Sequence, residues 1–157
     1  MFMKKFILLL YTCAVLTSCA DKPFVIIQIA DAQLGFDAAV KGQAPDAEYV
    51  NDLTYETEFL KQAVRKLNAL KADAVVFTGD QVNKPEDALQ WDTFADAISE
   101  IDSQTSVFHI PGNHDVLLSE GKVDITPFSS RYGEDRFVYS DNQVCIVGIN
   151  SNLIKSN

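Results

Sequence analysis

The sequence predicts an α/β fold around a parallel sheet, with its elements in the order strand, helix, strand, helix, strand. Two patterns carry this prediction. Short, continuous apolar runs alternate along the chain with longer segments in which apolar residues recur every three or four positions. Parallel strands that alternate with helices are joined by right-handed crossovers. The length of 157 residues allows one domain, or part of one.

The first strand is expected at residues 24–30, a continuous apolar run typical of a strand covered on both faces. Residues 31–46 are expected to form a loop, because glycine and proline recur there. Residues 47–70 follow a helical pattern with one apolar stripe. The members of this stripe are Phe59, Leu60, Ala63, Val64, Leu67 and Leu70.

Two more buried strands are expected at residues 74–78 and 106–110, on either side of a second helix. Pro85 is expected to open that helix, because the missing N–H of proline costs nothing in the first turn. Apolar residues at helical spacing predict the inner face of the helix. They are Ala88, Trp91, Phe94, Ala95, Ile98 and Ile101.

The remainder of the chain predicts irregular structure over residues 121–135, followed by a hairpin. Residues 136–140 and 144–150 are expected to be its strands, joined by a turn over residues 141–143. Cys145 lies in the second of these apolar runs, so we expect a small, buried, apolar side chain there.

The charge balance narrows the range of partners. With 13 Lys and Arg against 22 Asp and Glu, the formal net charge is −9. We expect no nucleic acid as a partner, because a sequence-independent grip on phosphate backbones needs clustered basic residues. An acidic balance suits a cation site, although most surface carboxylates are simply solvated.

The first residues look like an export signal. Lys4 and Lys5 precede an apolar run that ends at Leu16, which is too short to span a bilayer as a permanent helix. Leu16-Thr17-Ser18-Cys19 resembles a bacterial lipobox, which implies removal of residues 1–18 and lipidation of Cys19. Residues 19–23 would then tether the protein to a membrane of the bacterial cell envelope. An ordinary signal peptide with a chance cysteine is the alternative.

Each strand of the predicted sheet runs into a side chain that can bind a cation. These residues are Asp31, Asp80, Asn113, His114 and Asp115. Because the carboxyl ends of parallel strands meet at one edge of a sheet, we expect them to converge. Taken singly, each has an ordinary alternative, since an Asp after a strand more often caps a helix or forms a turn.

The neighbouring residues support this convergence. Gly79 and Gly112 let the backbone turn sharply and leave room beside the chain for a ligand. Carboxylate and amide oxygens suit hard cations, whereas imidazole suits borderline metals. His109 is expected to be structural, because it lies within a strand and not at its end.

Three short motifs resemble those of the calcineurin-like metallophosphoesterases, in the same order. They are Asp31-Ala32-Gln33, Gly79-Asp80-Gln81-Val82-Asn83 and Gly112-Asn113-His114-Asp115. The resemblance covers roughly residues 24–150. It implies a β-sandwich flanked by helices, hydrolysis of a phosphorylated substrate, and two divalent metal ions at the sheet edge. Manganese, iron, zinc or magnesium could fill the site.

The resemblance also implies a role for each site residue. Asp31 would bind the first metal, Asp80 would bridge both metals, and Asn113 would bind the second. His114 would stabilise or protonate the leaving oxygen, and Asp115 would orient the imidazole of His114.

One departure from the family's pattern is Gln33, which stands where most members have a metal-binding histidine. An amide oxygen can still bind a hard ion, and it shifts the preference toward manganese or magnesium, with manganese favoured. The pattern Asp-x-Gln-Leu-Gly, together with Asn150-Ser151-Asn152-Leu153 after the later strand, resembles a branch that includes serine/threonine protein phosphatases.

A second departure is the lack of any histidine after His114, where the family supplies further metal ligands. We therefore expect residues 24–157 to be the amino-terminal part of such a domain, truncated after the first β-α-β-α-β and the start of the second sheet. The activity of these residues by themselves is then expected to be low or absent. The alternative is a catalytically inactive exported lipoprotein that keeps the half-fold. The substrate class, whether phosphoprotein, nucleotide or phospholipid, stays open.

Overall fold

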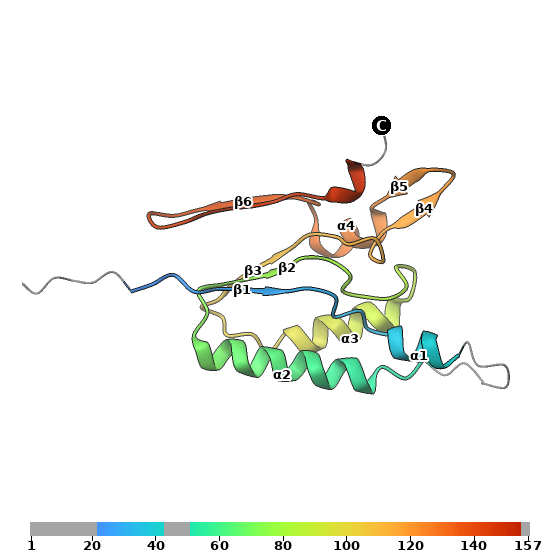
Figure 1. Ribbon diagram of the computed structural model, residues 1–157, viewed down its shortest axis with the longest axis horizontal. Coiled ribbons are helices and arrows are strands. Elements are labelled where there is room, and N and C mark those ends of the chain that lie inside the picture. The colour runs from blue at the N-terminus through green and yellow to red at the C-terminus, as the bar shows by residue number, and fades with distance from the viewer. Residues whose placement is uncertain (1–21, 43–50, 155–157) are drawn as a thin grey trace, which may run out of the picture.

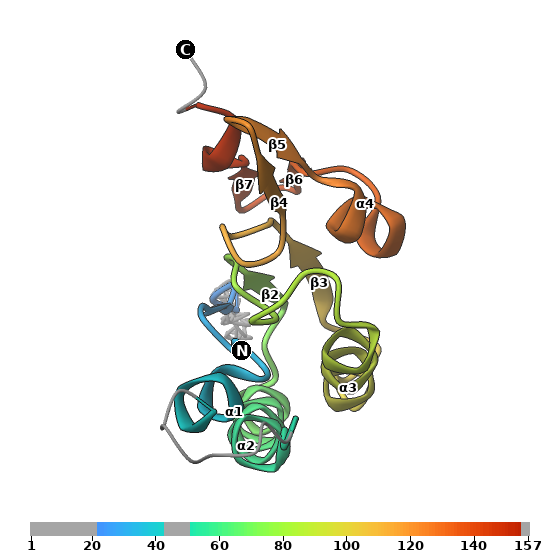
Figure 2. The same ribbon diagram turned by 90° about the vertical axis from the view of Figure 1, so that its right-hand side faces the viewer.

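The computed structural model describes residues 22–42 and 51–154 and places a small parallel sheet at the centre. Its strands lie in the order β1-β2-β3 and span Ile26–Ile29, Ala74–Phe77 and Ser106–His109. Figure 2 shows helices α1 to α3 on one side of this sheet and the later elements on the other side. The predicted parallel β-α-β-α-β arrangement is therefore confirmed.

Two helices cover the lower face of the sheet in Figure 1, namely α2, Thr54–Leu70, and α3, Ala88–Ile98. Their buried residues pack on β2 to form the core, which includes Leu60, Leu67, Val75, Phe77, Phe94 and Ala97. Two members of the predicted stripe lie outside this core. Phe59 and Leu70 are exposed, because only the narrower row through Leu60, Val64 and Leu67 is buried.

Both helices begin later than predicted. Residues 51–53 are not helical, and residues 47–50 lie outside the described part of the chain. The second helix begins after Asp87 and not at Pro85, because the Asp87 carboxylate caps it by accepting from the N–H groups of Leu89 and Gln90.

The prediction that every strand is covered on both faces is correct only for β2, whose residues are all buried. β1 and β3 are the outer strands of the three-stranded sheet and are partly exposed. Ile26 of β1 and Val107 of β3 are 43% and 38% exposed.

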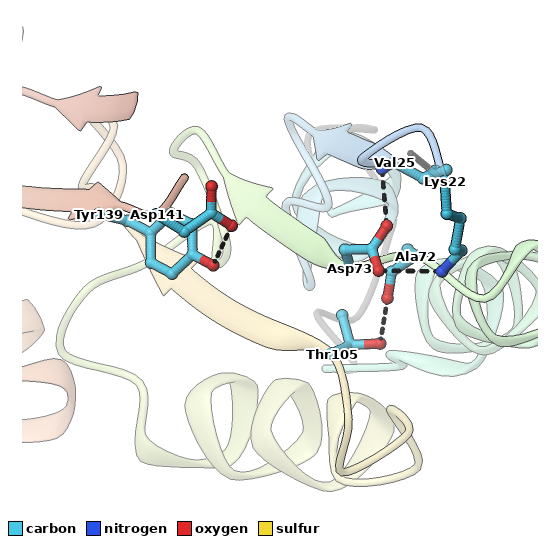
Figure 3. A network of polar contacts seen from close by, with 7 residues as sticks. All are labelled: Lys22, Val25, Ala72, Asp73, Thr105, Tyr139 and Asp141. Carbon is cyan, nitrogen blue, oxygen red and sulfur yellow. Dashed lines mark hydrogen bonds and ion pairs between the residues drawn. The ribbon is translucent and has the colours of Figure 1, made fainter. Parts of the chain in front are cut away.

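Hydrogen bonds hold the amino ends of the three strands in register (Figure 3). The Asp73 carboxylate accepts from the N–H of Val25 at 2.8 Å and from Nζ of Lys22 at 3.1 Å. Thr105 Oγ1 donates to the carbonyl of Ala72 at 2.8 Å. With this end of the sheet aligned, the opposite ends of the strands also lie level with one another.

The predicted hairpin is present, and its strands are β6, Phe137–Ser140, and β7, Cys145–Gly148. Phe137 stacks on Phe108 of β3 with ring centroids 4.6 Å apart, so the hairpin covers the second face of the sheet. The expectation for Cys145 is wrong. Cys145 is exposed, because alternation along β7 turns it outward with Val147 while Ile146 faces the sheet.

Four short elements were not predicted. They are α1, Phe36–Lys41, in the expected loop; β4, Leu117–Ser119, just before the region expected to be irregular; and β5, Lys122–Asp124, and α4, Thr126–Tyr132, within that region. The chain then turns through a short 3₁₀ helix, η1, Ser151–Leu153. Each is too short to leave a clear period in the sequence.

The predicted signal peptide, residues 1–18, and Cys19 lie outside the described residues. Lipid attachment and the cell-envelope location therefore stay predictions. Among the helices that the structure describes, none has the length and apolarity needed to cross a membrane.

Candidate functional site

The loops that follow β1 and β2 run side by side beyond the ends of the strands. The N–H groups of Asp31 and Gln33 donate to the carbonyls of Gly79 and Asp80 at 3.1 and 2.8 Å. A parallel bridge then joins Leu34 to Val82. These hydrogen bonds continue the sheet register and carry two motifs to the same edge.

The loop after β3 meets the loop after β2 at two glycines. Gly79 has a φ of 108°, and a Cβ built on it would lie 2.6 Å from Cα of Gly112. A Cβ on Gly112 would overlap the carboxylate of Asp80. Only glycine permits this approach. The expected turn at positive φ is present at Gly79, whereas the neighbouring loop, and not a ligand, occupies the space beside both glycines.

Asp31, Asp80 and Asn113 line one cavity of about 300 Å³ at this edge. The first strand and its loop supply Asp31, and the ends of β2 and β3 supply Asp80 and Asn113. The convergence expected from the topology is confirmed for these residues. Gln33 and His114 are not among the residues that line this cavity.

The backbone is strained at the same edge. Asp31, Gln33 and Asp80 have φ values of 55°, 43° and 51°, in the left-handed region that non-glycine residues rarely adopt. Such conformations cost roughly 1–3 kcal/mol each and cluster at functional sites. Contacts with the surrounding structure therefore hold these loops in backbone conformations that the residues would rarely adopt by themselves.

Gln33 and His114 both contact Asn83. Nε2 of Gln33 is 3.5 Å from Oδ1 of Asn83, and Nδ1 of His114 is 2.9 Å from the Asn83 carbonyl oxygen. A carbonyl oxygen only accepts, so Nδ1 of His114 carries the proton and Nε2 is left for a further partner. The carbonyl of Asn83 thus sets the tautomer and the direction of the imidazole.

Asp115 does not take the role expected for it. Its buried carboxylate accepts from the backbone N–H groups of Gln81, Val82 and Gly112 at 2.8–3.2 Å. Asp115 therefore ties the loop after β3 to the loop after β2, and Asn83 orients His114 in its place. Burial raises the pKa of Asp115 to about 6, although the backbone hydrogen bonds favour its charged form.

His109 is structural, as expected, although the structure makes it the last residue of β3 and does not place it inside the strand. Its ring lies between the rings of Phe77 and Tyr132, with centroid distances of 5.0 and 4.0 Å. Burial lowers the pKa of His109 to about 4, so the side chain is neutral near pH 7. Its Nδ1 is buried and has no hydrogen-bond partner within the described structure.

Two further residues contribute to the site. Asn152 lines the cavity, and its Nδ2 donates to the carbonyls of Pro111 and Gly112 at 3.2 and 3.1 Å. Gln90, fully buried, accepts from the N–H groups of Asn83 and Lys84. Asn152 belongs to the stretch Asn150-Ser151-Asn152-Leu153 that contributes to the family resemblance. No sequence pattern identifies Gln90, because it acts through backbone groups.

The donors at the cavity suit a hard divalent cation. Two carboxylates and two carboxamides line the same space, and oxygen ligands are what magnesium and manganese prefer. Within residues 22–42 and 51–154, no three His, Cys, Asp or Glu side chains are grouped to hold a metal.

Comparisons with known proteins agree with this arrangement. The profile of the calcineurin-like phosphoesterase family matches residues 24–154. Among solved structures, a purple acid phosphatase from seeds of yellow lupin (Lupinus luteus) resembles 80% of the chain, with a TM-score of 0.54 and 16% identity. The chain spans 24% of that protein's length, and at this identity the likeness concerns the fold. No curated protein matches the chain.

Proposed function

The chain belongs to the calcineurin-like phosphoesterase family, and we propose on that basis that it serves in metal-dependent hydrolysis of phosphate esters. The observation that carries this proposal is the single cavity shared by Asp31, Asp80 and Asn113. These residues come from the ends of three successive parallel strands, the place where open α/β sheets bind ligands.

Asp31, Asp80 and Asn113 would hold the divalent cations through their side-chain oxygens. Bound divalent cations lower the pKa of a coordinated water and offset charge on the phosphoryl group. The carboxylate of Asp80 already accepts from the N–H of His114 at 2.9 Å. That bond fixes one carboxylate oxygen and leaves the other available for a ligand.

His114 would act on the phosphate side of the site. Its Nδ1–H is held by the carbonyl of Asn83, so Nε2 is the nitrogen left for a substrate oxygen. Protonated, this nitrogen would donate a hydrogen bond to the leaving oxygen and stabilise the charge that develops there.

The first test is turnover of p-nitrophenyl phosphate by the full chain with manganese. Asp80→Asn is expected to lower the rate by about a hundredfold or more, because it removes a charged ligand. Asp92→Asn, at an exposed position on α3, serves as the control and should leave the rate unchanged. Equal, measurable rates in wild type and Asp80→Asn would contradict the proposal, whereas the absence of turnover in wild type would favour the non-catalytic alternative.

The same assay decides the alternative of a non-catalytic exported protein. That alternative predicts no turnover that depends on manganese and Asp80. It draws support from the small number of charged donors grouped in the described part of the chain. The membrane anchor at Cys19 is a separate proposal, tested by incorporation of labelled palmitate into wild type but not Cys19→Ala.

A further inference from the structure

A second cavity, of about 290 Å³, adjoins the proposed metal site. It lies between the carboxyl end of β1 and the amino-terminal half of α2, which runs below the sheet in Figure 1. Asp31 lines both this crevice and the cavity of Asp80 and Asn113. A molecule held at the metal site beside Asp31 can therefore reach into the crevice without leaving that site.

The crevice has an aromatic wall. Tyr55 and Phe59 lie one helical turn apart on α2, with ring centroids 4.8 Å apart, and they are 61% and 55% exposed. Ala30, Ala32 and Ala63 line the same space and leave it open. Packing of α2 in the core does not explain these two exposed rings, because the buried face of the helix is formed by Leu60 and Val64.

The charges of the crevice restrict what it accepts. Glu56 and Asp31 are the charged residues in its lining. The Glu56 carboxylate accepts from the N–H of Asp37 at 2.7 Å, so it is fixed in place beside the rings. Two carboxylates disfavour a second anionic group in this space, whereas a neutral planar group can stack on Tyr55 and Phe59.

We propose that Tyr55 and Phe59 form a binding site for a neutral aromatic group of the phosphate ester, next to the metal site. This inference rests on the proposed function, because that function places the phosphate beside Asp31. Phe59 and Tyr55 would determine which esters bind, and they would take no part in the reaction at phosphorus, which belongs to the neighbouring cavity.

The test is isothermal titration calorimetry of the full chain with phenylphosphonate and methylphosphonate in the presence of magnesium. Wild type should bind phenylphosphonate about tenfold tighter than methylphosphonate, and Phe59→Ala should lose this preference. Leu70→Ala is the matched control, since Leu70 is 60% exposed at the far end of the same helix. Adenosine 5′-monophosphate, compared with phenylphosphonate, tells whether the ring is attached directly or across a sugar.

A separate measurement keeps the two proposals distinguishable. Binding of 2-naphthol, which has no phosphate, is followed by its fluorescence in wild type, Tyr55→Ala and Asp80→Asn. The crevice predicts weaker binding in Tyr55→Ala and no change in Asp80→Asn, even if no variant hydrolyses any ester.

Equal affinity for 2-naphthol and for both phosphonates in wild type and Phe59→Ala would overturn the aromatic site, and turnover lost in Asp80→Asn would still support the proposed function. Self-association that depends on Tyr55 and Phe59, without any ligand preference, would assign the rings to an interface between copies. That result would also overturn the aromatic site.

Discussion

Gly112 and Asp80 touch at the point where two loops of the site meet. A Cβ on Gly112 would lie 2.7 Å from Cγ of Asp80 and overlap its carboxylate oxygen and backbone nitrogen. The backbone of Asp80 cannot yield easily, because the carbonyl and N–H groups around it bind the neighbouring loops. The proposed metal site therefore depends on a residue that carries no side chain.

We predict that Gly112→Ala destabilises the fold by about 1–3 kcal/mol, through the displacement of the loops. It should also weaken manganese binding, because it moves the Asp80 carboxylate. Chemical denaturation and calorimetry measure the two effects. Gly121→Ala is the control: Gly121 has a φ of 77° but open space around it, so the change should cost about 1 kcal/mol and leave metal binding intact.

Some features of the site follow from the topology of the sheet, and others depend on single contacts that only the folded chain shows. The convergence of Asp31, Asp80 and Asn113 follows from topology, so the sequence was enough to predict it. The partner of His114 was not predictable, because a backbone carbonyl, that of Asn83, takes the place expected for Asp115. Every residue has a backbone carbonyl, so the sequence does not indicate which of these groups will contact the imidazole of His114.

Among the elements, those with a clear apolar pattern were predictable, and these include the short β6–β7 hairpin as well as β2 and α2. β2 lies at its expected position, whereas α2 ends at Leu70 as expected but begins later, at Thr54. α1 and the β4–β5 hairpin are short and largely exposed, so they have little apolar pattern. Their positions are set by contacts with the rest of the fold.

The packing between β3 and α4 makes stability depend on pH. His109, at the end of β3, stacks on Tyr132 of α4. Burial lowers the pKa of His109 from 6.5 to about 4 in the folded protein. As pH falls from about 6.5 to 4, the unfolded chain takes up a proton that the folded chain does not, so this residue costs stability across that window.

We predict that His109→Phe raises the free energy of unfolding by about 1 kcal/mol at pH 7.5, because it removes a buried nitrogen without a partner. At pH 4.5 the gain should be larger by about 2–3 kcal/mol, since phenylalanine does not titrate. Urea unfolding at both pH values measures the difference. Asp115, whose pKa of about 6 gives the opposite trend, is present in both proteins and cancels. A gain of the same size at both pH values would contradict this account of His109.

At the scale of the whole molecule, layers on both faces of the sheet hold in place the edge formed by the carboxyl ends of its strands. Helices α2 and α3 lie on one face of the sheet and the β6–β7 hairpin on the other (Figure 2). Hydrogen bonds at the amino ends hold the strands in register, and the site lies at the carboxyl ends. The predicted α/β class and the family are both confirmed.

The central claim is that this edge binds divalent cations, and manganese binding to the full chain tests it most directly. Electron paramagnetic resonance of free manganese gives the affinity of wild type, Asp31→Asn, Asp80→Asn and the exposed control Asp92→Asn. Loss of either Asp31 or Asp80 is predicted to weaken binding by at least about tenfold, with no effect of the control. The same affinity in all four proteins would contradict the claim.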